Sequence, residues 1–156
     1  MLAIEDVITE SDMVDVRGLI RAHVEAHSEA HSVESVAALI AALPAPYTPP
    51  LGGLWIARED SEAAGCAALQ PILPGTGEVK RMYVRPEFRK RGIARALAQH
   101  VIAEARERGY TKLRLGTLKS MVPAQQLYTS LGFRPVPAYR PIEFGDTLFY
   151  ELSLDK

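Results

Sequence analysis

A basic corner that contains a glycine joins a strand pattern to a helix pattern in the middle of this chain. Residues 78–84 alternate between polar and apolar side chains, and apolar residues recur at helical spacing over residues 93–105. A strand that turns directly into a helix leaves the first amides of that helix without partners, and the helix dipole adds to their attraction for anions. The corner therefore predicts a phosphate site, built from Arg89, Lys90, Arg91, Gly92, Ile93 and Ala94.

Two details of this region say more about the ligand. Gly92 has no Cβ, so a phosphate can come close to the backbone there, and the cationic neighbours suit a polyanion such as a coenzyme pyrophosphate. The alternation of the strand slips by one residue between Val79 and Met82, which predicts a β-bulge, a feature found beside active sites. The residues alone thus indicate a phosphate-bearing ligand beside a bulged strand.

Two motifs in this chain resemble those of one enzyme family. Arg89, Gly92 and Ala94 fit the pattern Gln/Arg-x-x-Gly-x-Gly/Ala. A second pattern, Ala-x-x-Leu-Tyr-x-x-x-Gly-Phe, is fitted by Ala124, Leu127, Tyr128, Gly132 and Phe133. Both patterns are similar to those of the GNAT superfamily of N-acetyltransferases, and they stand in the family's order with a strand-like region at residues 111–117 between them. The resemblance covers nearly all of the chain and is weakest before residue 50.

The resemblance implies a reaction and a coenzyme. It implies transfer of an acetyl group from acetyl-CoA, the co-substrate, to a primary amine of a small or amino-acid-like molecule, by direct attack in a ternary complex and without a metal. The corner at residues 89–94 would hold the pyrophosphate. Backbone groups of Met82, Tyr83 and Val84 would pair with the pantetheine arm as an added strand does. Such a transfer also needs a neutral amine, stabilisation of the oxyanion and a proton for the thiolate.

Tyr128 and Glu78 are the predicted catalytic residues. The resemblance implies that Tyr128 is the general acid that protonates the leaving thiolate; the alternative is that its ring only packs a helix against the sheet. Glu78 begins the bulged strand and could deprotonate the amine, directly or through water, or could be an ordinary surface glutamate. The chain departs from the family at Met121, where many relatives have an asparagine that contacts the coenzyme.

Two proline-stiffened loops are predicted to contact the acceptor. One precedes residue 51 and the other follows residue 134. Their candidate contact residues are Tyr47, Tyr139, Arg140 and Glu143. Arg140 could pair with a carboxylate of the substrate, and the alternative is an exposed loop arginine.

The order of the patterns predicts one α+β domain over residues 1–156, a GNAT-like fold in which helices flank a mixed, mostly antiparallel twisted sheet. Strands are expected at residues 2–8, 54–58, 65–70, 78–84, 111–117 and 148–154. Helices are expected at about residues 9–30, 32–43, 93–108 and 123–131, with Thr9 or Ser11 as the first cap. Pro135, Pro137 and Pro141 are expected to stiffen the segment before the last strand.

The composition of the chain bears on which partners it binds and on the compartment in which it works. The single cysteine, Cys66, excludes an internal disulfide and fits a reducing cytoplasm. No apolar run approaches the roughly 20 residues that cross a bilayer, and the first residues lack the pattern of a signal peptide. A net charge of −1 gives no general reason to expect nucleic acid or a membrane as partner. A homodimer is suggested by analogy with the family alone.

Other interpretations of the histidines, of the acidic residues and of the function stay open. His23, His27 and His31 stand four residues apart and could bind zinc, although a surface or cleft-lining role is preferred. The acidic first 50 residues could face the acceptor, or could simply be solvated. Two rival functions remain: a non-catalytic acyl-CoA-binding or regulatory module, which Met121 favours slightly, and a protein N-terminal or lysine acetyltransferase. The second rival would need an open, shallow cleft, against which the proline loops argue weakly.

Overall fold

The strands of this protein form one sheet. The computed structural model describes residues 1–26, 33–142 and 146–154. Within these ranges the strand order is β1-β2-β3-β4-β5-β7-β6. Every neighbouring pair is antiparallel except β4 with β5. The sheet is mixed and mostly antiparallel, as predicted, and its strands are β1 (Leu2–Asp6), β2 (Gly53–Glu59), β3 (Glu62–Leu73), β4 (Thr76–Val84), β5 (Lys112–Leu118), β6 (Arg134–Val136) and β7 (Thr147–Ser153).

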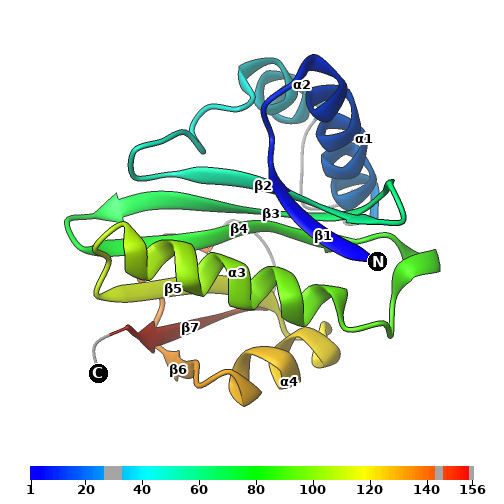
Figure 1. The fold of residues 1–156 in the computed structure, drawn as a ribbon. Helices are drawn as coiled ribbons and strands as arrows, with labels where there is room; N and C mark the ends of the chain where they lie inside the picture. The colour runs from blue at the N-terminus through cyan, green and yellow to red at the C-terminus, as the bar shows by residue number, and fades with distance from the viewer. Residues whose placement is uncertain (27–32, 143–145, 155–156) are drawn as a thin grey trace.

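Helices cover both faces of the sheet (Figure 1). Helices α1 (Glu10–Ala26) and α2 (Val33–Ala42) lie on one face, while α3 (Ile93–Glu107) and α4 (Val122–Ser130) lie on the other. A single 3-10 turn, Pro86–Phe88, links β4 to α3. This arrangement confirms the expected α+β class.

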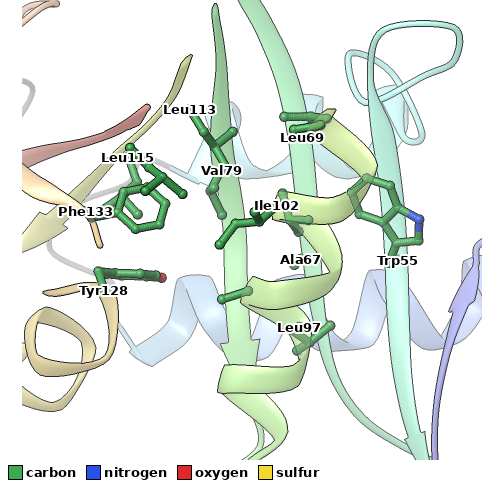
Figure 2. Packing of buried hydrophobic residues seen from close by; sticks show 14 of the residues in the cluster. Trp55, Ala67, Leu69, Val79, Leu97, Ile102, Leu113, Leu115, Tyr128 and Phe133 are labelled. Carbon is green, nitrogen blue, oxygen red and sulfur yellow. The ribbon is translucent and has the colours of Figure 1, made fainter. Parts of the chain in front are cut away.

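Each face of the sheet has its own apolar core. On the α3 face, the six buried residues of α3 follow the helical spacing seen in the sequence and pack on Trp55, Leu69 and Leu113 (Figure 2). On the opposite face, α1 and α2 pack on Ile56, Cys66 and other small or branched residues of the central strands. Alternate residues of one strand therefore serve different cores, as the period of two in a strand requires.

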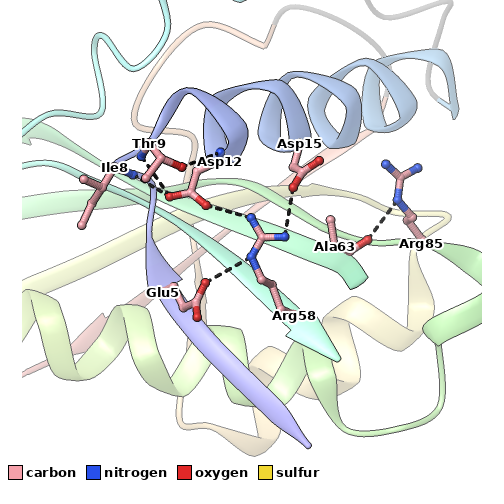
Figure 3. Close-up of polar contacts among 8 residues, drawn as sticks. All are labelled: Glu5, Ile8, Thr9, Asp12, Asp15, Arg58, Ala63 and Arg85. Atoms are coloured by element: carbon pink, nitrogen blue, oxygen red, sulfur yellow. Dashed lines mark hydrogen bonds and ion pairs between the residues drawn. The ribbon is translucent and has the colours of Figure 1, made fainter. Parts of the chain in front are cut away.

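The start of α1 is fixed by a capping box (Figure 3). The amide of Asp12 donates to Thr9 Oγ1 at 3.0 Å, and the amides of Ile8 and Thr9 donate to Asp12 Oδ2 at 3.1 and 3.0 Å. Thr9 is thus the cap, one of the two predicted. These backbone donors, together with Arg58, lower the pKa of Asp12 to about 2, because all of them favour the ionised carboxylate.

Arg58 on β2 joins three elements through carboxylates (Figure 3). Its Nε donates to Glu5 at 3.1 Å, its Nη2 to Asp12 at 2.8 Å and its Nη1 to Asp15 at 2.9 Å. The side chain of Arg58 is only 14% exposed, so these ion pairs are stronger than surface pairs of the same length. Three of the early acidic residues therefore tie β1 and α1 to β2 and are not simply solvated; that they also face the acceptor stays a prediction.

The short strand β6 was not predicted. Pro135, one of the prolines expected to stiffen this segment, lies opposite Tyr150 of β7 within β6. Strand β6 is the edge of the sheet, so one side of it needs no partner for its backbone. A proline, which has no N–H to donate, is tolerated at such an edge.

Candidate functional site

Strands β4 and β5 part in the middle of the sheet. Their parallel pairing covers Thr76, Gly77 and Glu78 of β4 and ends where Glu78 lies beside Arg114. Strand β4 continues to Val84 and stays paired with β3, while β5 continues beside β7. Backbone groups of residues 79–84 that face β5 therefore have no strand partner among the described residues. An extended ligand could pair with this free edge as an added strand does.

The free edge carries the predicted bulge. Arg81 has a φ of +54°, and the register with β3 shifts between Cys66 and Ala68, so that two β4 residues oppose one β3 residue. The carbonyl of Arg81 accepts a hydrogen bond from Cys66 Sγ at 3.3 Å. A positive φ in a residue with a side chain costs about 1 kcal/mol or more and persists where the surroundings enforce it. The slip in the sequence pattern thus located a strained residue.

The corner after β4 has the conformation expected of a phosphate site. Gly92 caps α3 with a φ of +79°, and Lys90 has a φ of +64°. A Cβ added to Gly92 would meet nothing within 4 Å, so the space beside this backbone is open. The first backbone hydrogen bond of the helix runs from Ala96 to Gly92, and the preceding amides of α3 are free to bind a ligand.

The basic side chains of the corner contact different parts of the protein. Arg89 donates from Nε to the carbonyl of Val84 at 3.0 Å and so fixes the corner to the end of β4. Its guanidinium carbon also lies 5.8 Å from the ring centre of Tyr83. Arg91 lies over the ring of Phe88, at 5.3 Å from its centre. Arg89 thus has a structural role in addition to any contact with an anion.

Tyr128 lies on α4 at the edge of the α3-side core. Its ring is 5% exposed and packs edge to face on Phe133 at 5.6 Å between centres. Figure 2 shows its hydroxyl pointing from α4 toward β4. Burial raises the pKa of Tyr128, so the hydroxyl keeps its proton at neutral pH. The ring packs a helix against the sheet, and the hydroxyl remains directed at the strand that parts from β5.

Glu78 is buried where the two strands part. It is 2% exposed, which makes the alternative of a surface glutamate wrong. Its Oε2 accepts from the hydroxyl of Tyr139 at 2.6 Å and from Nε of Arg140 at 3.1 Å. Nζ of Lys80 lies 3.8 Å from Oε1. Glu78 is therefore a buried carboxylate held by two cations and a phenol at the point where the strands part.

The loop between β6 and β7 supplies the partners of Glu78. Arg140 pairs with this protein carboxylate, so the alternative of an exposed loop arginine was wrong. A Cβ on Gly116 of β5 would lie 2.9 Å from Nη2 of Arg140, so the glycine leaves room for the guanidinium in this position. Burial and then the hydrogen bond to Glu78 raise the pKa of Tyr139. Glu143, the fourth predicted contact, lies outside the described residues.

Tyr47 is placed differently from the other predicted contact residues. It is 2% exposed and belongs to the core under α1 and α2. Its hydroxyl accepts from Nε of Arg81 at 3.0 Å, which links it to the bulge and not to Glu78. Sequence reasoning singled out Tyr47 but missed Arg81, although the slip in the strand pattern marked the position.

A second missed residue is Arg114. Its Nε donates to Glu151 at 2.8 Å, and its guanidinium carbon lies 4.9 Å from the ring centre of Tyr139. No pattern within β5 distinguishes this arginine from a solvated one, because its partners come from β7 and the preceding loop.

Of the three histidines that stand four residues apart, the structure describes only His23. His23 stacks on Tyr83 at 5.5 Å between ring centres, while His27 and His31 lie outside the described residues. Within the described ranges, no group of three histidine, cysteine or acidic side chains is placed to hold a metal ion. The helices in those ranges also include none that is long and apolar enough to cross a membrane.

Residues 16–133 match the family model described as the acetyltransferase (GNAT) family. The chain belongs to this family. GNAT enzymes use acetyl-CoA as acetyl donor, and relatives of this chain are named as N-acetyltransferases. An uncharacterised N-acetyltransferase of Schizosaccharomyces pombe is 35% identical over 112 residues, which are 70% of this chain and 69% of that protein. The chain is an N-acetyltransferase by this membership.

Other relatives match over a smaller share of their length. The uncharacterised N-acetyltransferase YsnE of Bacillus subtilis is 42% identical over 82 residues, 51% of this chain and 54% of that protein. The N-acetylaspartate synthetase of Danio rerio is 39% identical over 92 residues, 58% of this chain but 33% of that protein. The matched region is therefore about half of YsnE and a third of the synthetase.

Solved structures confirm the GNAT fold. A GNAT acetyltransferase of Staphylococcus aureus Mu50 superposes with a TM-score of 0.81 at 21% identity, covering 99% of this chain and 100% of that one. The PaiA N-acetyltransferase of Thermoplasma acidophilum, solved in complex with coenzyme A, has a TM-score of 0.74 at 16% identity, with coverage of 98% and 99%. At these identities the likeness is one of fold.

Proposed function

We propose that this GNAT protein transfers the acetyl group of acetyl-CoA directly to a primary amine of a small, amino-acid-like molecule in a ternary complex. One observation carries the proposal: β4 parts from β5 at the buried Glu78, and the Tyr128 hydroxyl points toward the strand that parts. A free strand edge can bind the coenzyme, a carboxylate can take a proton from the amine, and a phenol can give a proton to the thiolate, and direct acetyl transfer from a thioester uses all three.

The coenzyme fits the residues of β4 and the corner. Met82, Tyr83 and Val84 have a backbone edge without a strand partner, which suits the amides of a pantetheine arm. The first turn of α3, capped by Gly92, offers free amides and open space to a pyrophosphate. The coenzyme A complex of the PaiA neighbour supports the same kind of ligand for this fold. Bound there, the coenzyme supplies the activated acetyl group.

The side chains have separate tasks in this proposal. Tyr128 holds a proton at its hydroxyl and donates it to the leaving sulfur, and its raised pKa prevents earlier loss of that proton. Glu78 accepts a proton from the amine, directly or through water. Lys80 and Arg140 lie beside Glu78, and their charge favours the neutral form of a nearby amine. The amine then attacks as a nucleophile.

The acceptor class rests on the proline-stiffened loops, which argue weakly against an open cleft, and on the name of one relative. The printed name of the Danio rerio relative includes an acetylated amino acid, which supports an amino-acid-like acceptor for this chain. The proposal needs neither nucleic acid nor a membrane. It places the enzyme in the cytoplasm, where the buried thiol of Cys66 stays reduced, and it works equally for a monomer or a homodimer.

The test is acetyl-dependent thiol release measured with a panel of small amines, amino acids and peptides. We expect turnover with at least one small amine, with saturation by both substrates and no acetylated enzyme. Binding of acetyl-CoA by calorimetry without turnover on any amine would favour the non-catalytic rival. Turnover on peptides alone would favour the protein acetyltransferase.

A further inference from the structure

We propose that the acceptor carries a carboxylate, and that the guanidinium of Arg81, oriented by Tyr47, binds it. The inference rests on the proposed function and names the substrate class of the same site. Arg81 is the bulged residue of β4, and its backbone and side chain are both held in place.

A bulge and two hydrogen bonds restrain Arg81. Its φ of +54° is enforced by the bulge, its carbonyl accepts from Cys66 Sγ at 3.3 Å, and its Nε donates to the hydroxyl of Tyr47 at 3.0 Å. Tyr47 itself is 2% exposed, so it is a rigid acceptor for that Nε. A strained and over-determined arginine beside the free edge of β4 is typical of a functional position.

The two terminal nitrogens of Arg81 are available. In the part of the chain that the structure describes, Arg81 has no ion pair, and its only side-chain hydrogen bond is the one from Nε. The side chain is half-buried, so its charge is partly removed from water without a carboxylate to offset that cost. A guanidinium whose Nε is fixed presents Nη1 and Nη2 as a fork, which matches a carboxylate.

The cations around Arg81 lie on one face of the sheet. Lys80 pairs with Ala68, and Tyr83 pairs with Cys66, and both of those β3 residues belong to the core under α1. Paired residues of antiparallel strands share a face, so Lys80 faces α1. The Arg81 side chain reaches the same side, because it contacts Tyr47 of that core.

Charge on this face favours an anionic acceptor. Arg140 pairs with Glu78 and Arg114 with Glu151, so each of these two carboxylates already has an arginine. Lys80, Arg81, Arg114 and Arg140 bring four cations to the neighbourhood of Glu78 and Glu151. Their positive charge attracts an anion to the site, and the fork of Arg81, which has no ion pair among the described residues, gives that anion a defined position.

The position suits acetyl transfer to an amino acid. Arg81 directly precedes Met82, the first of the residues that the proposed function pairs with the pantetheine arm. It lies three residues after Glu78 on the same strand. A molecule whose amine and carboxylate are a few bonds apart can therefore bind to Arg81 with its amine directed at the region between Glu78 and the thioester. Met82 and Tyr83 carry no charge that would oppose this orientation.

The experiment compares amino acids with their carboxamides as acceptors, which removes the carboxylate and keeps the amine. We expect the wild-type enzyme to prefer the acids. Arg81→Gln should lower kcat/KM for the preferred acid about tenfold or more, mainly through KM, and leave the carboxamide rate unchanged. Arg106→Gln, at an exposed arginine in the last turn of α3, is the matched control and should change neither.

Tyr47→Phe tests the positioning role separately. The ring is kept, so the core is preserved, and thermal unfolding verifies that it is. We expect a higher KM for the acid than in the wild type, a smaller effect than that of Arg81→Gln, and an unchanged kcat. Equal use of acids and carboxamides by the wild type, or equal losses on both in Arg81→Gln, would overturn the carboxylate inference alone. A lack of turnover on every amine would overturn the proposed function as well.

Discussion

The hydroxyl of Tyr139 lies 2.6 Å from Oε2 of Glu78 and joins the loop before β7 to the strand that parts from β5. Together with Arg140 it occupies one oxygen of the carboxylate, while Oε1 has Lys80 at 3.8 Å. Oε2 of Glu78 is thus held by two hydrogen bonds, while Oε1 has the more distant contact with Lys80.

Glu78→Gln should reveal whether this carboxylate takes a proton from the amine. We expect kcat to fall by about 10²–10⁴ near neutral pH, the usual contribution of a general base. The loss should shrink as the pH rises toward the pKa of the acceptor amine, since more amine is then neutral without help. Glu151→Gln, which removes the partner of Arg114 on the same face, is the control. A loss of equal size at every pH would leave Glu78 with a positioning role only.

Tyr128→Phe removes the hydroxyl and keeps the ring that packs on Phe133. We expect kcat to fall about a hundredfold or more, because the thiolate then leaves without a proton donor. The affinity for acetyl-CoA, measured by calorimetry, should stay within about twofold. Tyr150→Phe alters another buried tyrosine of the same core and should keep its activity. An unchanged rate in Tyr128→Phe would end its assignment as general acid.

Gly92→Ala tests the phosphate corner, and the chain offers a matched control at the other end of α3. Gly92 and Gly109 both have positive φ, +79° and +85°, and a Cβ at either would meet no atom within 4 Å. Both alanine variants should therefore lose about 1 kcal/mol of unfolding free energy. Only Gly92→Ala should weaken acetyl-CoA binding, by about tenfold, since only there would the Cβ obstruct the pyrophosphate. Equal affinities of the two variants for acetyl-CoA would argue against the corner as the pyrophosphate site.

Asp12→Asn tests the contribution of the capping box to stability against pH. The folded protein lowers the pKa of Asp12 from 3.8 to about 2, so the stabilisation is present above pH 4 and is lost as the pH falls through about 2. At pH 7 we expect the free energy of unfolding of the variant to be about 1–2 kcal/mol lower than that of the wild type. Urea unfolding at several pH values should show this difference narrowing below pH 4. A constant difference down to pH 2 would contradict the assignment.

The sequence was sufficient where neighbouring residues determine the structure. The slip between Val79 and Met82 predicted the bulge, and the basic corner with Gly92 predicted the start of α3. Both follow from local periodicity and from the conformations that glycine permits. The same holds for the cap at Thr9.

The contacts that define the site could not be predicted in this way. The partner of Glu78, Tyr139, lies 61 residues later in the chain, and Tyr47 lies 34 residues before Arg81. Such pairs depend on how the loops fold back across the sheet, which no local pattern encodes. Strand β6 was missed for a related reason: only its place at the edge of the sheet makes Pro135 acceptable there.

The parting of β4 from β5 leaves an edge of β4 without a strand partner among the described residues, and a ligand that pairs with this edge would complete the sheet. A coenzyme that pairs there would add to the cohesion of the protein as well as to its chemistry, because any ligand that binds only the folded form stabilises it. Resistance to protease should then rise with coenzyme concentration. The supply of coenzyme would then affect how long the folded enzyme survives as well as how fast it turns over.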